Sequence, residues 1–314
     1  MSDKLCILCP GQGAQAVGMG KDFHAVSPIA RDTFDTANRI LGFDLAGLCF
    51  AGPEERLNQT DISQPAIFAT SVAAFRAAVS AGKLQPGASS VYAGLSLGEY
   101  TALHLAGVFS FEEGLKLVAA RGRYMQEAAV ATPGGMVAIL GADDAQVDEL
   151  CTRCAQGDVL VPANYNAPGQ IVVSGSVAAC QRILSAAEAG GFKAMPLKVA
   201  GAFHSSLMRS AAERMQAELE KVTFASPRAT VFANVTAAPH ADPASIKQLL
   251  VRQIVSPVKW SQTMRALLAD ADLRFVELAP GRTLAGLAKR INRRLAIDSL
   301  ASADALTTNN GQLP

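Results

Sequence analysis

One serine in this sequence lies in a pattern that can make it a nucleophile. Ser96 is the centre of Gly94-Leu95-Ser96-Leu97-Gly98, between an apolar segment that predicts a strand and a segment that predicts a helix. The glycines leave space for a sharp turn, and the positive end of the following helix favours negative charge developing on the serine oxygen. The same pattern in a loop would carry no chemistry. The strand and the helix on either side favour a catalytic serine.

A serine nucleophile needs a base, and the four histidines are the candidates. His104 lies on the helix that Ser96 opens, roughly 12 Å away along its axis, which is out of reach. His240 falls in a proline-containing turn that we expect to be solvated, and His24 is expected to be a surface or core residue. His204 lies where a strand gives way to a helix, at the sheet edge where sites gather. Elimination favours His204, and no carboxylate is identified as a third member of a triad.

Arg121 lies within the apolar stripe of a predicted helix over residues 111–130, next to Met125. Burying a guanidinium group costs free energy unless an anion meets it. From the residues alone, a structural partner such as Glu99 or Asp61 is one way to supply that anion.

Two other patterns suggest bound groups, and both are weak. Residues 11–16 imitate a dinucleotide-binding fingerprint, which expects an acidic residue at the end of a second strand. Asp32 and Asp35 lie in a predicted helix instead. The two Cys-x-x-Cys pairs, at 6–9 and 151–154, are too far apart in the chain for a zinc ribbon. We therefore expect buried reduced thiols, no metal and no nicotinamide cofactor.

Composition excludes several classes of protein. The 314 residues carry a net charge of +1, so no global field gathers nucleic acid or anionic lipid. No stretch approaches the roughly 20 apolar residues of a membrane helix, and the short apolar run of residues 1–9 does not suffice for a signal peptide. These features predict a soluble, cytoplasmic protein that binds neither nucleic acid nor a membrane.

The order of elements predicts an α/β protein with a largely parallel sheet, because apolar strands alternate with amphipathic helices. The pattern changes after residue 131, where strand, helix, strand, strand, helix and strand follow one another, as in a ferredoxin-like unit. We expect a discontinuous large domain over 1–130 and 200–300, with a small domain inserted at 131–199. Residues 301–314 are expected to be a frayed tail.

Several segments, in this order, resemble the malonyl-CoA:acyl carrier protein transacylases of fatty acid synthesis and the related acyltransferase domains of polyketide synthases. The resemblance covers nearly the whole chain and implies a hydrolase-like α/β domain with a ferredoxin-like insert. The matching segments are PGQGAQ at 10–15, SLGEY at 96–100, RGRYMQ at 121–126, NYNAPGQ at 164–170, AFHS at 202–205, VRQ at 251–253, PVKW at 257–260 and ELAPG at 277–281.

The resemblance implies roles for the residues around the nucleophile. Ser96 would carry the malonyl group as an ester, and His204 would deprotonate it and later protonate the departing thiolate. A carbonyl oxygen of Gln253 would orient His204, which would explain the missing carboxylate. The backbone N–H groups of Gln12 and Leu97 would form the oxyanion hole.

The resemblance also implies how the substrate is chosen. Arg121 would meet the free carboxylate of malonyl, and Phe203 would leave too little space for the extra methyl of methylmalonyl. Asn166 and Met125 would lie in the substrate pocket. Leu95 departs from the family, which usually has histidine before the nucleophile. This difference affects selectivity or rate rather than the class of reaction.

The predicted function is transfer of malonyl from malonyl-CoA to the phosphopantetheine thiol of an acyl carrier protein, for fatty acid synthesis. No tightly bound cofactor is expected, since the coenzyme A thioester is a substrate. The alternatives are a malonyl transferase acting in trans for a polyketide synthase, a serine (thio)esterase, or a docking module without catalysis. Arg290, Arg293 and Arg294 on the last predicted helix are expected to contact the acidic carrier protein, with a solvated helix face as the alternative.

Overall fold

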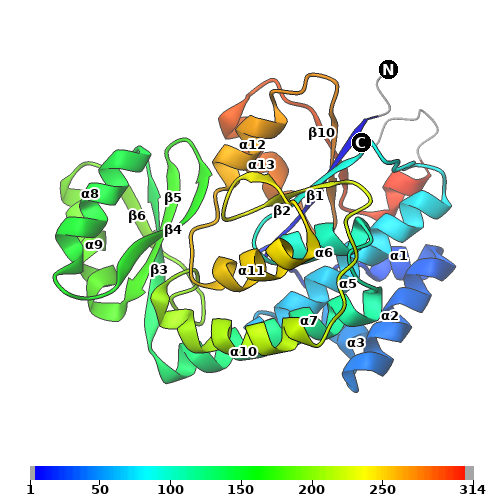
Figure 1. Cartoon of the computed structure of the whole chain (residues 1–314), viewed down its shortest axis with the longest axis horizontal. Helices are drawn as coiled ribbons and strands as arrows, with labels where there is room; N and C mark the ends of the chain where they lie inside the picture. Colours follow the sequence, from blue (N-terminus) through cyan, green and yellow to red (C-terminus); the bar gives the residue numbers. More distant parts are fainter. Residues whose placement is uncertain (1–3, 308–314) are drawn as a thin grey trace.

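The larger of two sheets places its strands in the order β10-β9-β1-β2-β7-β8 (Figure 1). The computed structural model describes residues 4–307. All strand pairs in this sheet are parallel except the last, between β7 and β8. The predicted α/β fold with a largely parallel sheet is confirmed. The strands are β1 Leu5–Cys9, β2 Val91–Gly94, β7 Thr230–Ala233, β8 Ala238–Pro239, β9 Arg274–Leu278 and β10 Ile297–Leu300.

Alternate residues of β1 enter two apolar cores, because neighbouring side chains of a strand point to opposite faces. Leu5, Ile7 and Cys9 pack in one cluster, and Cys6 and Leu8 in the other. Helices therefore cover both faces of the sheet, as parallel sheets require. Those of the large sheet are α1 Lys21–Val26, α2 Pro28–Leu41, α3 Leu45–Ala51, α4 Glu54–Leu57, α5 Thr60–Ser80, α6 Leu97–Leu105, α7 Phe111–Ala131, α10 Arg209–Glu220, α11 Pro243–Ile254, α12 Trp260–Leu267 and α13 Thr283–Ile291, with short 3₁₀ turns at Ser206–Met208 and Ala303–Leu306.

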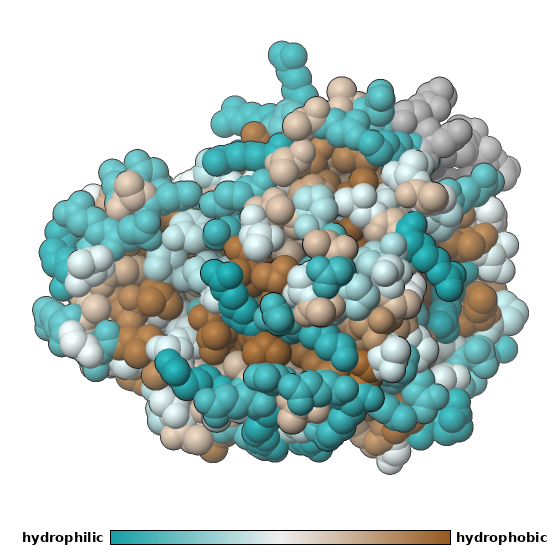
Figure 2. All heavy atoms as spheres, in the orientation of Figure 1, coloured by the Kyte–Doolittle hydropathy of each residue, from teal (hydrophilic) through white to brown (hydrophobic). Residues whose placement is uncertain are grey.

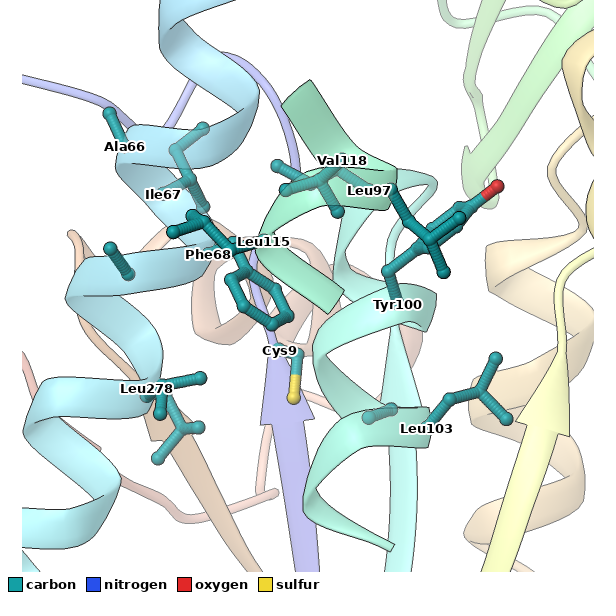
Figure 3. Packing of buried hydrophobic residues seen from close by; sticks show 14 of the residues in the cluster. Cys9, Ala66, Ile67, Phe68, Leu97, Tyr100, Leu103, Leu115, Val118 and Leu278 are labelled. Carbon is teal, nitrogen blue, oxygen red and sulfur yellow. The ribbon is translucent and has the colours of Figure 1, made fainter. Parts of the chain in front are cut away.

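Helix α5 lies inside the first core. It is the one helix among residues 4–307 that is long and apolar enough to cross a membrane, so the expectation that no stretch approaches this length is wrong. Its most apolar window is 83% buried within the fold, as expected for a core helix. Phe68 of α5 shares a cluster with Leu115 of α7, and Figure 3 shows its ring pointing from α5 toward α6. Hydrophilic side chains instead cover the outer face of α10 (Figure 2).

Close contact between α5 and α7 depends on a glycine. A Cβ atom at Gly122 would lie 2.5 Å from the carbonyl oxygen of Thr60, well inside van der Waals contact. Any larger residue would push the helices apart. Since Arg121 precedes this glycine, the contact also sets how near its guanidinium comes to α5.

The second sheet is antiparallel, with the strand order β4-β5-β3-β6, and helices α8 and α9 pack against it (Figure 1). It has an apolar core of its own, so we propose that residues 131–199 form a domain inserted into the larger one. Backbone hydrogen bonds join β4 to Val258 of the larger unit. Its elements are β3 Gly134–Leu140, α8 Asp144–Ala155, β4 Leu160–Ala167, β5 Gln170–Ser176, α9 Val177–Ala189 and β6 Lys193–Pro196.

The expected frayed tail at 301–314 is wrong for its first half. Ala303 and Ala305 are buried, and the N–H of Ala303 donates to Asp22 at 2.6 Å. Strand β10, immediately before, pairs with β9 and brings this segment back to the sheet. The polar composition of the chain end concealed these contacts. Residues 308–314 lie outside the described part.

Candidate active site

Ser96 occupies a sharp turn between β2 and α6. Its backbone has φ 51° and ψ −103°, a conformation that non-glycine residues rarely adopt. A Cβ at Gly98 would lie 2.1 Å from the carbonyl oxygen of Cys9, so only glycine fits there. The N–H of Ser96 donates to Oδ1 of Asn234 at 2.6 Å. Contacts with neighbouring backbone and with the side chain of Asn234 thus keep the strained turn in place.

His204 stands directly against the nucleophile. Its Nε2 lies 2.9 Å from Oγ of Ser96, and its Nδ1 lies 2.8 Å from the carbonyl oxygen of Gln253. A carbonyl can only accept, so Nδ1 carries the proton and the lone pair of Nε2 faces the serine hydroxyl. The ring is therefore oriented as a general base by a backbone group.

The surroundings of His204 keep its ring neutral. Burial, and after it the positive charge of Arg121, lower the pKa of His204 to about 4, although the backbone hydrogen bond to Gln253 acts in the opposite direction. At neutral pH such a ring carries a proton on Nδ1 alone, and its Nε2 is unprotonated. It can accept the proton of Ser96 without first losing one to solvent.

Arg121 is buried, with 1% of its surface exposed, and reaches the same serine. One terminal nitrogen donates to Oε1 of Gln64 at 2.7 Å; the other donates to Oγ of Ser96 at 3.0 Å and to Oε1 of Gln253 at 2.9 Å. Its Nε lies among buried atoms without a partner in the described residues.

Neither carboxylate considered as a partner for Arg121 forms an ion pair with it. Asp61 lies 3.7 Å from Arg56, and Glu99 bonds to His240. Across residues 4–307, Arg121 has no carboxylate within ion-pair distance. Its direct partners are neutral oxygens, so the charge at the nucleophile lacks a direct counter-ion and favours an anionic ligand.

A cavity of about 420 Å³ opens over these groups. The loop after β1 forms one wall, and the N–H of Leu95 donates to the carbonyl oxygen of Cys9 at 3.1 Å, which joins that loop to the nucleophile turn. The second sheet contributes another wall through β4 and the segment after β6. Eight residues predicted for the site line the cavity: Gln12, Leu95, Ser96, Arg121, Met125, Asn166, Phe203 and His204.

The other two predicted residues, Leu97 and Gln253, are not among the residues that line the cavity, and the roles expected of them rest on backbone groups. Leu97 is the first residue of α6, and Gln253 supplies the carbonyl for His204. Within the described residues, the backbone N–H groups of Gln12 and Leu97 donate to no protein acceptor. They are free to meet an oxyanion.

The expectation for His240 is wrong. Its side chain is fully buried, and Nε2 lies 2.9 Å from Oε1 of Glu99. The hairpin of β7 and β8 folds this residue back beneath the nucleophile turn, a long-range placement that a proline-containing turn does not reveal. His104 and His24 contact other groups, the carbonyl of Phe109 and the ring of Phe50 respectively.

Two amide side chains of the site, those of Gln64 and Asn234, have no signal in the sequence. Gln64 lies in a helix and Asn234 at a strand end, and neither belongs to a motif. Gln253 lies in the VRQ segment, which indicates its carbonyl oxygen but not the contacts of its side chain. Only the hydrogen bonds reveal these three side chains. The cysteines are all free and buried, and no three His, Cys, Asp or Glu side chains between residues 4 and 307 are grouped to hold a metal.

Comparison with known proteins places this geometry in a family. Residues 7–310 match the acyl transferase domain. The chain belongs to the acyl transferase domain family. It is 42% identical over 299 residues to the malonyl CoA-acyl carrier protein transacylase of Salmonella typhimurium, covering 95% of this chain and 96% of the relative. The acyltransferase identity predicted from the motifs is confirmed.

Solved structures agree with this acyltransferase fold. The malonyl CoA-acyl carrier protein transacylase of Coxiella burnetii superposes with a TM-score of 0.93 at 38% identity, covering 98% of this chain and 96% of that one. A malonyl-transacylase solved in complex with a type II polyketide acyl-carrier protein superposes with a TM-score of 0.91 at 38% identity, covering 96% and 97%.

Proposed function

We propose that this acyltransferase moves malonyl from malonyl-CoA to the phosphopantetheine thiol of an acyl carrier protein, as a supply step for fatty acid synthesis in the cytoplasm. The observation that carries the proposal is the buried guanidinium of Arg121, which lies 3.0 Å from Oγ of Ser96 without a carboxylate partner. A substrate that presents a carboxylate beside its thioester fits this site. The names of the relatives support the same substrate.

The first half of the reaction forms an ester on the enzyme. Oγ of Ser96 attacks the thioester carbonyl while Nε2 of His204 takes its proton. The tetrahedral oxyanion is met by the N–H groups of Gln12 and Leu97. As the carbon–sulfur bond breaks, His204 returns the proton to the coenzyme A thiolate. The carrier thiol then attacks the ester by the same steps in reverse.

These steps need no tightly bound cofactor. A thioester and an ester are exchanged without any change of oxidation state, and His204 moves the only proton. Ser96 and His204 therefore supply the nucleophile and the acid–base group that acyl transfer requires.

The cavity walls support malonyl over bulkier acyl groups. Phe203 precedes the base in sequence, is 5% exposed and lines the cavity, so it occupies space that a branched acyl group would need. Leu95 presents an apolar side chain to the acyl group. Met125 and Asn166 complete this part of the wall, and Oδ1 of Asn166 is buried without a partner among residues 4–307.

The intact mass of the chain after incubation with malonyl-CoA tests the function. A stable malonyl adduct that is lost on addition of holo carrier protein, with malonyl appearing on the carrier, supports transfer. Free malonate instead would indicate a hydrolase, and an unmodified chain would indicate a docking module. Fatty acid and polyketide carriers assayed side by side identify the physiological acceptor.

The pH dependence of acylation follows from the environment of His204. Because the pKa of His204 is lowered to about 4, the second-order rate constant for acylation should stay level from neutral pH down to about pH 5. It should fall below about pH 4, where the base is protonated. Stopped-flow release of coenzyme A measures this profile.

A matched variant separates the causes of that shift. Arg121→Met removes the second cause of the lowered pKa, so the acidic limb should move to higher pH. If the acidic limb of the wild-type pH profile lay near pH 6.5, the inference that His204 is buried and neutral would be wrong. His204 takes up a second proton near pH 6.5 in the unfolded chain but only near pH 4 in the folded chain. The free energy of unfolding therefore decreases as the pH falls from about 6.5 to about 4. Circular dichroism at each pH shows whether a loss of rate is caused by unfolding.

We also propose that the carrier protein docks on a basic patch defined by Arg290, Arg293 and Arg294. All three are exposed, and within residues 4–307 they form no ion pair. The prediction that they share the last helix is wrong in part, because α13 ends at Ile291 and Arg293 and Arg294 follow it. The patch borders Pro168, in the hairpin whose strand β4 carries Asn166 of the cavity wall.

Neutralising this patch should weaken carrier binding but not malonyl loading. Changing all three arginines to glutamine should raise the KM for the carrier several-fold and reduce its dependence on salt, since steering by opposite charges is lost. Acylation by malonyl-CoA should keep its rate. A control triple change at exposed Arg39, Lys116 and Arg153 should leave the carrier KM unaltered; an equal effect there, or none at the patch, refutes the docking site.

A further inference from the structure

A buried carboxylate lies beneath the nucleophile turn and takes no part in the mechanism above. Glu99 on α6 is 1% exposed. Its Oε2 accepts the backbone N–H of Asn234 at 2.9 Å and Nε2 of Gln253 at 2.7 Å. Its Oε1 meets Nε2 of His240 at 2.9 Å. Three donors, two from the β7–β8 hairpin and one from α11, thus converge on one carboxylate.

Two of these donors belong to the residues that hold the reacting groups. The side chain of Asn234 accepts the N–H of Ser96 at 2.6 Å and donates to the carbonyl of Gly94 at 2.7 Å, so it fixes both sides of the turn. Nε2 of Gln253 also donates to the carbonyl oxygen of Ser96 at 3.0 Å.

Gln253 carries the network to the other two functional groups. Its side-chain oxygen accepts from Arg121 at 2.9 Å, and its backbone oxygen holds Nδ1 of His204 at 2.8 Å. The nucleophile, the base and the guanidinium are therefore all held by Asn234 or Gln253. Both residues in turn donate to Glu99.

The side chain of the third donor, His240, has a single polar contact within residues 4–307, the one to Glu99. The histidine side chain is fully buried, and its Nδ1 has no partner among the described residues. A carboxylate oxygen accepts, so Nε2 of His240 carries a proton and donates it to Oε1 of Glu99. His240 therefore acts as a donor that occupies the remaining oxygen.

We propose that Glu99 and His240 form a positioning pair that aligns Ser96, His204 and Arg121 through Asn234 and Gln253. The inference rests on the proposed function, since it concerns the rate of the same acyl transfer. Without the donor at position 240, Oε1 of Glu99 lacks its partner and the carboxylate can turn. Gln253 then loses the bond that sets its side chain, and the alignment of His204 and Arg121 loosens with it.

Two nearly isosteric substitutions of His240 test the pair. His240→Gln places an N–H the same number of bonds from Cα as Nε2 of histidine, whereas His240→Met fills the space without a donor. We expect the methionine variant to acylate with kcat lowered about tenfold and with KM for malonyl-CoA within about threefold of wild type. The glutamine variant should recover most of the rate. His104→Met is the matched control, because His104 is a histidine on α6 whose Nδ1 bonds elsewhere, to the carbonyl of Phe109.

The outcomes separate positioning from general stabilisation. Rates are compared well below the melting temperature of each variant, at equal folded fraction. An unchanged kcat in His240→Met, the same loss in His240→Gln, or an equal loss in His104→Met overturns the pair. A methionine variant that is unfolded where the glutamine variant is folded also overturns it, since the pair then serves the fold. Wild-type protein without malonyl transfer would instead refute the proposed function.

Discussion

Replacement of Ser96 by alanine is expected to abolish the covalent malonyl adduct. Among residues 4–307, Oγ of Ser96 is the one nucleophilic atom that both His204 and Arg121 contact, at 2.9 and 3.0 Å. Without it there is no atom to carry the ester, and transfer should fall by a factor on the order of 10⁴ or more. Intact mass after incubation with malonyl-CoA, followed by transfer to holo carrier protein, measures both effects.

The fold of this variant should survive. Alanine keeps the backbone bond from residue 96 to Asn234, and the turn is held mainly by Gly94, Gly98 and their contacts. The melting temperature should therefore stay close to that of the wild type. Should a malonyl adduct persist on the folded Ser96→Ala chain, peptide mapping would place the nucleophile elsewhere.

Replacement of Arg121 by alanine is expected to change which acyl group the enzyme prefers. Two parallel hydrogen bonds from a guanidinium fit a carboxylate, a geometry that an ammonium does not reproduce. A hydrogen bond to a charged group contributes about 1.5–3 kcal/mol, or roughly a ten- to hundredfold preference for malonyl over acetyl. Arg121→Ala should lose most malonyl transfer and gain acetyl transfer relative to it. The ratio of kcat/KM for malonyl-CoA and acetyl-CoA measures this preference.

The ratio of the two kcat/KM values also separates loss of carboxylate recognition from a general loss of alignment in the site. Removing Arg121 frees Oε1 of Gln64 and of Gln253, so both rates can fall through loss of alignment. Such damage lowers both rates together, whereas loss of carboxylate recognition changes their ratio. Arg121→Lys, which keeps the charge but not the fork, should fall between the two. Wild-type kcat/KM for malonyl-CoA in Arg121→Ala would make the arginine structural.

The parts of the fold and site that the sequence predicted are those with a local pattern. The strand, turn and helix around Ser96 follow from glycine spacing and apolar periodicity, and the buried stripe of α7 predicts the burial of Arg121. His204 was reached by elimination among only four histidines. The resemblance to a family then indicates Gln12, Leu97 and Gln253, whose expected roles rest on backbone groups and therefore have no side-chain signature.

The parts that the sequence did not predict depend on long-range packing. Asn234 reaches the nucleophile turn, and His240 reaches Glu99 beneath it, only because β7 lies beside β2 and its hairpin folds inward. Gln64 reaches Arg121 because Gly122 lets α7 approach α5. In the sequence, an amide or a histidine at these positions cannot be told from a surface residue. The last strand, β10, has no local signal in the sequence, because its burial depends on pairing with β9. Helix α13 separates these two strands in the chain.

The position of β1 in the large sheet has a consequence for biosynthesis. This first strand pairs on one side with β2 and on the other with β9, whose residues are synthesised long after those of β1. The sheet therefore remains incomplete until β9 and β10 have left the ribosome, whereas the strands of the second sheet pair with one another within residues 134–196 and can do so earlier. His204 and Gln253 are also late residues, so a nascent chain presents the serine before it has a base. Truncated products then lack the acid–base group needed to consume a thioester.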